Sequence, residues 1–547
     1  MEKQISPVLI VGAGPTGLTF ALQLVRYGIP FHIIDKHAAP LELSKAAAIH
    51  ARTLEIFADL DVIDDVLTAG QRVDILDLRT RYADRMRLDF SRLKHTAYPF
   101  MLDLPQYRTE AILRQKLEQL GYQIERGVQL VDLHQEQDYV DVRLRHVDGP
   151  EEHRQVSWLI GADGAKSTVR TLAGLDFPGE AYADDWVLVD AKLKWPLPRN
   201  EMTFSSDPDG IYGVFPLPGE NRYRVAYTQS RDAAGHLIEP DLEDVQRSIH
   251  RTGIAGQVLQ VDQFSTFNLA HRHVEQSQKG RIFLAGDAAH VHTPFGGQGM
   301  NLGIGDAYNL GWKLASVLRG EAPESVLASY QHERAAVVKN VIRTTHLGVL
   351  AMLIKTGRQA QLRDGLMQAL GSSAFVPRTL TYAFSQLAHH YRHSPLSQGR
   401  ALRLQAGDRA PNQAFFDGIT QSYMNLYDVL QGTTYSLLLF VGEKEQQILA
   451  LKPLLQAVTS QVPGQIAVSI VSTAYQRLAE LPPSVGFLSD RSKDLSLYHQ
   501  FGATVAYLIR PDKYIGYIQV NPTWEHLERY LQRVILGRPL ALASASR

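Results

Sequence analysis

The chain has 547 residues, of which 45% are hydrophobic and 21% charged, and its 56 Lys and Arg residues against 57 Asp and Glu residues give a net charge of −1. Length alone predicts about three to four domains, and this composition excludes disordered and low-complexity classes of protein. The near-zero net charge excludes nucleic acid as the default partner, because binding through counterion release requires an excess of positive charge.

The chain contains no cysteine, which excludes disulfides, thiolate metal sites and cysteine nucleophiles. Residues 1–6 are polar and the apolar run at 8–11 is too short for a signal peptide. No apolar stretch reaches the about 18–20 residues of a spanning helix. The sequence therefore predicts a cytoplasmic protein without a membrane span. Histidines occur without the HExxH spacing, so no metal site is predicted.

The first predicted elements form a dinucleotide-binding unit. Residues 7–11 are a continuous apolar run, typical of a strand buried on both faces. GAGPTG follows at 12–17 and opens a predicted helix, and the next predicted strand begins with FHII at 31–34 and ends at Asp35. The order strand, GxGxxG, helix, strand and acid is the fingerprint of a site for FAD or NAD.

Each residue of this unit has its own task. Gly12 makes the tight turn, Gly14 lets a pyrophosphate approach the backbone, and Gly17 lets the helix pack on the strand. The N–H groups at the helix start face the phosphates. Asp35 is placed to accept a ribose 2′-hydroxyl and would repel a 2′-phosphate, which excludes NADP from this site. The predicted contacts here are Gly12, Ala13, Gly14, Pro15, Thr16, Gly17, Asp35 and Lys36.

Two later motifs distinguish FAD from NAD. Residues 156–161 predict a strand that runs into Asp163-Gly164, a pair that alone is also typical of an ordinary turn. GRIFLAGDAAH at 280–290 predicts another strand, and PFGGQGMN at 294–301 opens a helix with a continuous apolar face. A glycine loop at a helix start presents N–H donors and positive dipole to an electron-rich ligand edge, which suits a flavin.

The three motifs, in this order and spacing, resemble the single-component flavoprotein aromatic hydroxylases of the para-hydroxybenzoate hydroxylase and phenol hydroxylase superfamily. The last motif is the most specific, because GDAAHxxxPxGGQGxN has few false positives. The resemblance covers roughly the first 400 residues. It implies an FAD-dependent monooxygenase that uses NADPH or NADH and O2 to hydroxylate a small aromatic substrate, phenolic or polycyclic polyketide, through a flavin C4a-hydroperoxide. The matching residues beyond the motifs are Asp306, Asn309, Trp312 and Lys313.

The resemblance also implies roles for single residues. Gln106 and Asp287 would contact the ribityl and phosphate region of FAD, and Asp163 would lie between FAD and the approach of the nicotinamide donor. The loop before the helix would present backbone N–H groups to the flavin O2/N1 edge, and Pro294 would line the substrate side. The implied contacts in these motifs are Gln106, Asp163, Asp287, Gly297, Gln298, Gly299, Met300 and Asn301.

One position departs from the family pattern. Lys45 stands where the family usually has an arginine that faces the pyrophosphate or the nicotinamide donor. Lysine keeps the charge but loses the bidentate fork of arginine. Lys45 is expected to contact FAD or NADPH. Arg52, on the following predicted helix, is a second candidate for this contact, with a solvated helix charge as its alternative interpretation.

Residues 179–270 contain short β-prone runs split by Pro and Gly turns, and they predict a sheet that covers the substrate. Tyr212 and Phe215 are the candidate substrate-side aromatics of this sheet, with plain core packing as the alternative. No catalytic side chain is assigned with certainty, because the flavin carries the difficult chemistry. Tyr212 and Pro294 are the candidate substrate-side residues.

The region 401–547 predicts a separate domain after the turn-rich stretches 394–399 and 407–412. Its order of elements resembles the thioredoxin-like extension of the phenol hydroxylase branch, where Arg-Pro-Asp recurs as at Arg510-Pro511-Asp512. Without cysteine it has no thiol chemistry, so packing on the FAD domain or homodimerisation is its expected use. The predicted strands are 435–441, 466–471, 504–509 and 514–520, and the predicted helices are 443–458, broken near Pro453, 495–501 and 524–536.

The expected architecture is α/β. A Rossmann-like FAD-binding domain spans 1–178 and 271–400, with 72–104 partly in the substrate sheet; the inserted β-sheet domain is 179–270, and the C-terminal domain is 401–547. A Baeyer–Villiger or epoxidising monooxygenase on the same fold is the main alternative function. A flavin reductase or oxidase and a non-catalytic FAD-binding scaffold are further alternatives, and a halogenase is disfavoured because WxWxIP is absent.

Overall fold

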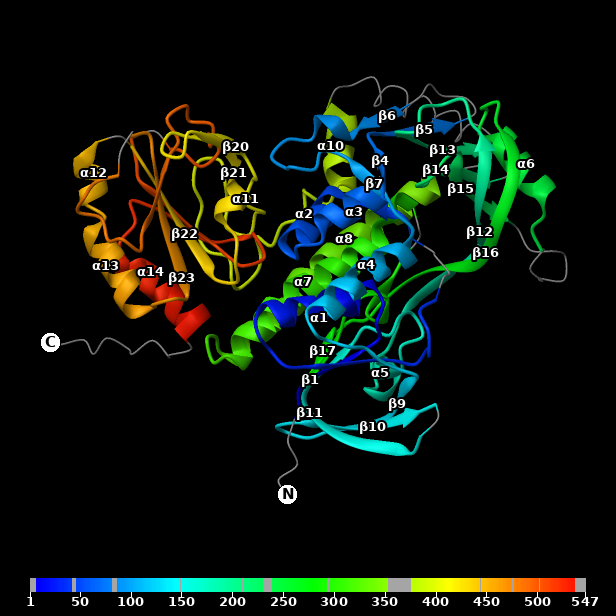
Figure 1. Ribbon diagram of the computed structural model, residues 1–547, viewed down its shortest axis with the longest axis horizontal. Helices are drawn as coiled ribbons and strands as arrows, with labels where there is room; N and C mark the ends of the chain where they lie inside the picture. Colours follow the sequence, from blue (N-terminus) through cyan, green and yellow to red (C-terminus); the bar gives the residue numbers. More distant parts are fainter. Residues whose placement is uncertain are drawn as a thin grey trace.

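The computed structural model describes residues 6–41, 46–80, 86–147, 149–207, 210–229, 239–292, 295–352, 375–442, 444–474, 477–500 and 502–536. The strands in these ranges form two eight-stranded sheets, one five-stranded sheet and two small sheets. The two large sheets lie on one side of the long helices α7 (Gln298–Leu318) and α8 (Ala328–Met352), and the five-stranded sheet forms a lobe on the other side (Figure 1). No helix within these ranges is long and apolar enough to cross a membrane.

The first eight-stranded sheet is parallel at its centre, where β1 lies between β2 and β11. Val8, Leu9 and Ile10 are fully buried, because α1, α4 and α7 cover one face and side chains of β9 and β10 pack against the other. A strand covered on both faces needs a continuous apolar run. The elements are β1 (Ser6–Val11), α1 (Pro15–Arg26), β2 (His32–Asp35), α4 (Gln106–Gln119), β8 (Glu125–Arg126), β9 (Val128–Gln135), β10 (Val140–His146), β11 (Glu151–Gly161), α5 (Thr168–Leu172), β17 (Gln278–Lys279) and β18 (Ile282–Leu284).

The second eight-stranded sheet presents two different faces. One packs on α6 (Leu242–Arg251). The other, here called the inner face, consists of Leu76, Leu78, Trp186, Leu188, Met202, Phe204, Ile211, Phe215 and Ala226 and packs toward α10 (Phe375–Phe384). The strands, in sheet order, are β19 (His290–Val291), β16 (Gln257–His273), β12 (Gly179–Lys194), β15 (Arg222–Gln229), β14 (Gly210–Pro216), β13 (Glu201–Asp207), β5 (Ile75–Thr80) and β6 (Met86–Asp89).

Shorter elements connect the two large sheets. β7 pairs with β3 and with β4 in a small antiparallel sheet beside α2 and α7. The bounds are β3 (Ala48–Ile49), α2 (Ala51–Asp59), α3 (Ile63–Ala69), β4 (Gln71–Val73) and β7 (Met101–Asp103), with single 3₁₀ turns at Phe90–Arg92, Gly286–Ala288, Phe295–Gly297 and Glu324–Leu327.

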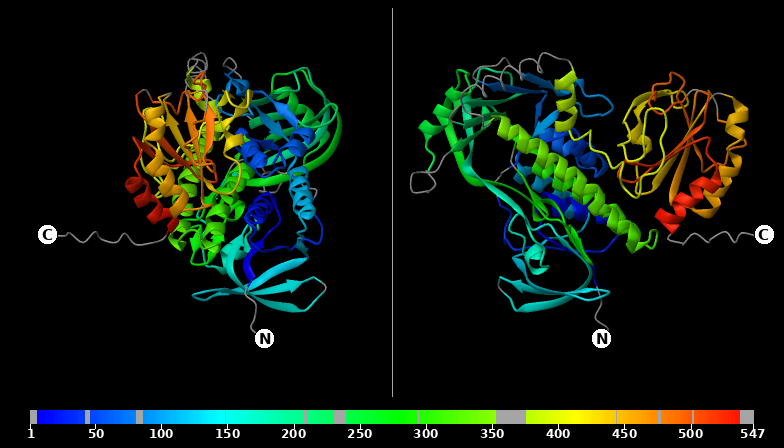
Figure 2. Two further views of the ribbon diagram at one scale, coloured as in Figure 1. Left: turned by 60° about the vertical axis from the view of Figure 1, so that its left-hand side comes forward. Right: turned by 180° about the vertical axis from the view of Figure 1, so that it is seen from behind.

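The C-terminal lobe is built on β22, whose seven residues are all buried. β22 pairs in parallel with β23 and antiparallel with β25, so α12 and α13 form the crossover between the parallel strands. Figure 2 shows this lobe from two further sides, with α14 on its flank. The elements are β20 (Ala414–Asp417), β21 (Ser422–Asn425), α11 (Leu426–Val429), β22 (Tyr435–Val441), α12 (Glu445–Leu449), α13 (Lys452–Gln461), β23 (Ile466–Ser472), β24 (Gly486–Ser489), β25 (Val505–Ile509), β26 (Ile515–Val520) and α14 (Trp524–Leu531), followed by a π turn (Gln532–Leu536).

Three details of this lobe differ from the expectation. The helix expected over 443–458 is two helices, and the break falls before Pro453, which occupies the first turn of α13, where proline is tolerated. Within the helix expected over 495–501, residues 495–498 form turns and 499–500 have no regular structure. Asp490 accepts the backbone N–H groups of Asp494 and Leu495 at the start of this stretch. The hairpin of β20 and β21 and the edge strand β24 were not expected.

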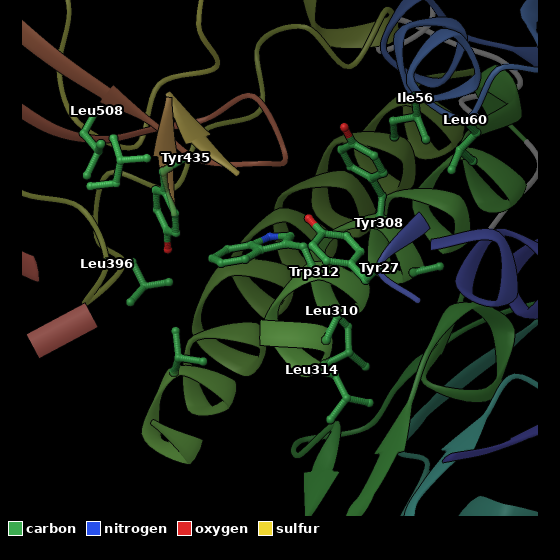
Figure 3. Packing of buried hydrophobic residues seen from close by; sticks show 14 of the residues in the cluster. Tyr27, Ile56, Leu60, Tyr308, Leu310, Trp312, Leu314, Leu396, Tyr435 and Leu508 are labelled. Atoms are coloured by element: carbon green, nitrogen blue, oxygen red, sulfur yellow. The ribbon is translucent and has the colours of Figure 1, made fainter. Parts of the chain in front are cut away.

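The C-terminal lobe and α7 share one apolar core. Trp312 of α7 meets Tyr435 of β22 edge-to-face, with ring centroids 5.8 Å apart. Figure 3 shows Trp312 between Tyr435 on the lobe side and Tyr27 and Tyr308 on the other. The core of the first sheet therefore continues into the lobe without a break.

Candidate cofactor and substrate site

The loop after β1 is shaped by its glycines. Gly12 has φ +104°, and a Cβ there would lie 2.4 Å from the Ala162 carbonyl oxygen. A Cβ on Gly17 would lie 1.9 Å from the Gly12 carbonyl oxygen, so helix α1 can approach β1 only with glycine at this position. Gly14 is different, because the nearest atom to its added Cβ is Glu110 Oε1 at 4.0 Å. The space beside Gly14 is open to a ligand, while Gly12 and Gly17 are needed for packing.

Asp35 fixes this loop from the end of β2. Its Oδ2 accepts the Ala13 N–H at 2.9 Å and its Oδ1 accepts the His37 N–H at 2.9 Å. Helix α1 begins at Pro15 with Gly14 as N-cap, and no side-chain cap occupies its first turn in the described structure. The N–H groups at this helix start are therefore oriented toward the open space beside Gly14, an arrangement that favours an anion.

Gln106 and Glu110 close the other side of this space. Gln106 donates through Nε2 to Glu110 Oε1 at 2.9 Å. Burial is the main cause that raises the pKa of the Glu110 carboxyl, and the charge of Asp35 adds to it. Glu110 was not singled out from the sequence, although its position one turn after Gln106 on the same predicted helix places both on one face.

Three segments meet at Thr16. A Cβ on Gly286 would lie 2.5 Å from Thr16 Oγ1, and a Cβ on Gly303 would lie 2.3 Å from the same atom. The loop at Gly286-Asp287, here called the GD loop, is therefore in direct contact with α1 and α7. Both Gly286 and Gly303 must be glycine for the loop and α7 to come this close to Thr16. Asp287, the second residue of the GD pair, lies on the exposed side of the loop.

Asp306 of α7 holds this junction in place. Its carboxylate accepts the Gly286 N–H at 2.9 Å, His290 Nε2 at 2.6 Å and Arg334 Nε at 2.6 Å. Burial alone would raise the pKa of Asp306, but His290 and Arg334 outweigh it and lower the pKa to about 2. Asp306 is therefore ionised and binds the GD loop to α7 and α8.

The start of α7 is a second helix N-terminus without a side-chain cap in the described structure. Gly297 is its N-cap with φ +62°, and a Cβ there would lie 2.7 Å from Ala48 Cβ. Asn301 donates to the carbonyl oxygens of Ala48 at 2.8 Å and Gly297 at 2.7 Å, and accepts the His50 N–H at 2.9 Å. Because its side chain is used in this way, Asn301 has only backbone groups to offer a cofactor.

His50 and Gln298 complete this loop. His50 donates through Nε2 to the Gly296 carbonyl at 2.8 Å, and burial lowers the pKa of its imidazole to about 4, so it is neutral near pH 7. Gln298 donates to the Phe384 carbonyl at 3.2 Å and accepts from Gln386 at 2.5 Å. Nothing in the sequence near His50 or Gln386 indicated these contacts, because their partners lie 88 or more positions away.

Two expected cofactor contacts have other partners. Arg52 donates to Glu55 Oε2 at 2.9 Å and to the Asp512 carbonyl at 2.8 Å, buried against the C-terminal lobe. The Asp163 carboxylate accepts the Thr168 N–H at 2.7 Å at the start of α5, while its backbone lies against Gly12. We therefore exclude the Arg52 side chain from the cofactor site. Asp163 borders the site only through its backbone beside Gly12. Lys45 and Pro294 lie outside the described residues.

Tyr212 and Phe215 lie on opposite faces of β14, as the period of two along a strand requires. Tyr212 packs on the α6 side, where its hydroxyl is 3.2 Å from Asp207 Oδ1 and 3.2 Å from Arg251 Nη1. Phe215 lies on the inner face, where its ring meets Phe204 at a centroid distance of 5.0 Å. Tyr212 is thus a core residue, which corrects its expected place on the substrate side.

The inner face reaches the α7 loop through Phe384 of α10. Phe384 packs on the inner-face cluster. Its ring also lies against Gly296, where an added Cβ would be only 2.3 Å from a ring carbon of Phe384. The apolar inner face and the start of α7 therefore border the same region of the molecule.

One charged group interrupts this apolar surface. Arg224 donates to Asp190 at 2.7 and 3.0 Å. The two residues pair across β15 and β12, each two positions from an inner-face residue, so they lie on the inner face. In the described structure Arg224 Nη1 has no hydrogen-bond partner, and neither has either carboxyl oxygen of the buried Asp103. Burial raises the pKa of Asp103 to about 8, against the opposing charge of Arg224. These atoms are buried polar groups that the protein itself leaves unpaired within the described residues.

Comparisons with known proteins agree with this geometry. A family model described as an FAD binding domain matches residues 6–345. A 6-methylpretetramide 4-monooxygenase of Streptomyces rimosus is 37% identical over 403 residues, covering 72% of this chain and 71% of the relative. A pentachlorophenol 4-monooxygenase of Sphingobium chlorophenolicum is 32% identical over 437 residues, covering 79% of each. The solved structure of an anhydrotetracycline hydroxylase from Streptomyces rimosus matches with a TM-score of 0.76 at 28% identity, covering 97% of this chain and 99% of that chain.

Proposed function

The chain belongs to the FAD-binding-domain family of FAD-dependent aromatic hydroxylases, and from that membership we propose that it hydroxylates a phenolic or polycyclic aromatic compound held between the α7 loop and the inner face. The protein is a flavoprotein monooxygenase that uses NAD(P)H as co-substrate. The observation that carries the proposed location is the shared contact of Phe384 with Gly296 and with the inner-face cluster.

The residues present fit FAD. The open space at Gly14, the uncapped start of α1 and the anchored Asp35 suit a pyrophosphate and its ribose. The uncapped start of α7, set by Gly297 and Asn301, suits the electron-rich edge of a flavin ring. We assign the cofactor contacts to these two helix starts and to the GD loop at Gly286 and Asp287, with Gln106 closing the phosphate side.

FAD, when bound, supplies electron transfer from NAD(P)H to O2 and insertion of one oxygen atom into the substrate. The chain supplies orientation and exclusion of water. Asp306 and Asn301 fix the two glycine loops through hydrogen bonds to backbone groups, so the N–H donors hold one direction. The apolar inner face keeps water from the reacting region, which limits loss of oxidant as H2O2.

The inner face also supports the proposed substrate class. Its large apolar and aromatic surface suits a planar ring system, and Arg224 Nη1 offers one donor for a substrate oxygen. Relatives carry names that refer to 6-methylpretetramide, anhydrotetracycline and pentachlorophenol. We therefore propose that the substrate of this chain is an aromatic ring system that bears at least one oxygen.

We propose the division into an FAD-binding region (1–178 and 271–400), a substrate sheet (179–270) and a C-terminal domain (401–547). The order β24-β23-β22-β25-β26, with a helical crossover between β22 and β23 and a helix after β26, supports a thioredoxin-like fold for the last. This domain packs on α7 in the described structure.

A substrate screen tests the proposal. The purified protein, loaded with FAD, is mixed with NADPH or NADH and a panel of phenols and polycyclic aromatics, and both cofactor consumption and product mass are measured. We expect consumption stimulated by polycyclic phenols and a product that gains one oxygen with aromaticity retained. A ring-expanded lactone would instead favour Baeyer–Villiger chemistry, and absence of stimulation across the panel would contradict the proposed substrate class.

A further inference from the structure

The turn between β25 and β26 carries the Arg-Pro-Asp sequence that the proposed chemistry does not use. Arg510, Asp512 and Lys513 are all buried, with at most 3% of each residue exposed. Lys513 reaches Asp59 Oδ1 of α2 at 3.1 Å, and the Asp512 carbonyl accepts Arg52 at 2.8 Å. This turn of the C-terminal domain is therefore inserted among helices of the FAD-binding region.

Arg510 contacts α8 with a forked pair of hydrogen bonds. Its Nη1 donates to Glu333 Oε1 at 2.5 Å and its Nη2 donates to Glu333 Oε2 at 2.9 Å. The same guanidinium donates through Nε to Asp512 Oδ1 at 2.9 Å. A planar guanidinium bonded on two sides fixes direction as well as distance.

The same cluster includes α7. Lys313 donates to Glu333 Oε2 at 2.7 Å, and Asn309 donates to the same oxygen at 2.7 Å. Two cations, Lys313 and Arg510, thus face two anions, Glu333 and Asp512, in a site closed to water. Arg510 and Lys313 lower the pKa of Glu333 well below its usual range despite its burial. Arg510 is the member of this balanced cluster that comes from the C-terminal domain and binds α8.

The next residue along α8 connects this cluster to the cofactor site. Arg334 donates to Asp306 at 2.6 Å, and Asp306 accepts the Gly286 N–H of the GD loop. Arg334 also donates to the Tyr391 hydroxyl at 3.0 Å, and the Arg510 guanidinium lies 5.4 Å from the Tyr391 ring centroid. A continuous set of contacts therefore runs from Arg510 to the backbone of Gly286.

Stability alone does not account for this arrangement. Buried ion clusters contribute little net stability compared with apolar groups of similar size, because the charges lose their hydration. Trp312 and Tyr435 already provide an apolar contact between the domain and α7. What a charged cluster adds is a fixed geometry, since its hydrogen bonds hold only in one arrangement of α7 and α8.

We propose that Arg510 is a positioning residue for the FAD site, acting through Glu333 and Arg334 to hold Asp306, and with it the loop at Gly286-Asp287 that Asp306 anchors through the Gly286 N–H, where the cofactor needs that loop. The inference rests on the FAD site proposed above and adds to it a part of the C-terminal domain. Arg510 does not touch the cofactor; it sets the register of α8 against α7, and that register sets the GD loop.

The test compares FAD affinity with stability in the full-length protein. Arg510→Met removes the charge and the fork at similar length, and Arg510→Lys keeps the charge and removes the fork. The control is Asp490→Asn, which weakens a buried carboxylate that holds Asp494, Leu495 and His499 within the C-terminal domain alone. Each variant is titrated with FAD by flavin fluorescence at a temperature at which it is folded, and its melting temperature is measured without FAD.

We expect the Kd for FAD to rise about tenfold in Arg510→Met and about threefold in Arg510→Lys. Asp490→Asn should lower the melting temperature with an unchanged Kd and flavin spectrum. An unchanged Kd in the Arg510 variants, with a lowered melting temperature, would overturn the positioning role. If Arg510→Met does not fold, Arg510→Lys decides by the same criterion. Failure of the unaltered protein to bind FAD would refute the proposed site itself, which separates the two conclusions.

Discussion

Replacing Asp306 by Asn tests the anchor of the GD loop. The carboxylate accepts three hydrogen bonds, from the Gly286 N–H, His290 and Arg334. An amide of the same shape has a single acceptor oxygen, so its NH2 group would face a donor on one side. In either orientation of the amide, the buried charge of Arg334 loses the carboxylate that balances it.

The size of the loss follows from burial and pKa. Only 1% of Asp306 is exposed, and its pKa lies at about 2 against the ordinary 3.8. That difference corresponds to about 2–3 kcal/mol, and removing one partner of a buried ion pair costs about 3–5 kcal/mol. Because the folded pKa is depressed, this stabilisation is present above pH 3.8 and disappears as the pH falls toward 2.

Urea unfolding without FAD, followed by tryptophan fluorescence, measures the loss, and a titration with FAD measures the effect on the site. We expect Asp306→Asn to lose about 3 kcal/mol and most of its FAD affinity at pH 7. Asp132→Asn, in an exposed pair with Arg143, is the matched control and should change stability by less than about 1 kcal/mol. A variant at position 306 as stable as the control would refute the anchoring role.

Two further predictions concern single side chains. Gly14→Ala should lower the stability of the FAD-free protein by no more than about 1 kcal/mol, because the added Cβ meets no atom closer than 4.0 Å and only the poorer N-cap of α1 counts against it. The same Cβ should weaken FAD binding by filling the phosphate space, and equal FAD affinity would place the phosphates elsewhere. Phe215→Ala should raise the KM for the aromatic substrate and Tyr212→Phe should not, because the two lie on opposite faces of β14; the reverse order in steady-state assays would exchange their roles.

The local shape of the glycine loops follows from short-range sequence. Glycine is needed where another part of the chain occupies the place of a Cβ atom, as at Gly12, Gly17 and Gly286. Such positions can be recognised in the sequence as glycine motifs. The opposite faces of Tyr212 and Phe215 also follow from their spacing, since an odd separation along a strand reverses the side chain. That rule shows from the sequence that Tyr212 and Phe215 cannot share one face, and the packing of Tyr212 on the α6 side then identifies it as the core residue.

Contacts between distant segments could not be predicted in this way. Arg510 and Glu333 are 177 positions apart, and Arg52 and Asp512 are 460 apart. Arg52 carries a charge on an amphipathic helix, which alone fits solvent or a phosphate as well as a buried carboxylate. Its place against the C-terminal domain depends on how that domain packs on α2 and α7, which no local pattern specifies.

Isotope labelling tests whether the protein inserts one atom of O2 into an aromatic substrate. The FAD-loaded protein is supplied with NAD(P)H, 18O2 and the aromatic compound that most stimulates NAD(P)H consumption, and the product is analysed by mass spectrometry. We expect a product with one added 18O atom and an intact aromatic ring, and no product without FAD. A product whose added oxygen comes from water, or NAD(P)H oxidation that yields only H2O2 with every aromatic tested, would contradict it.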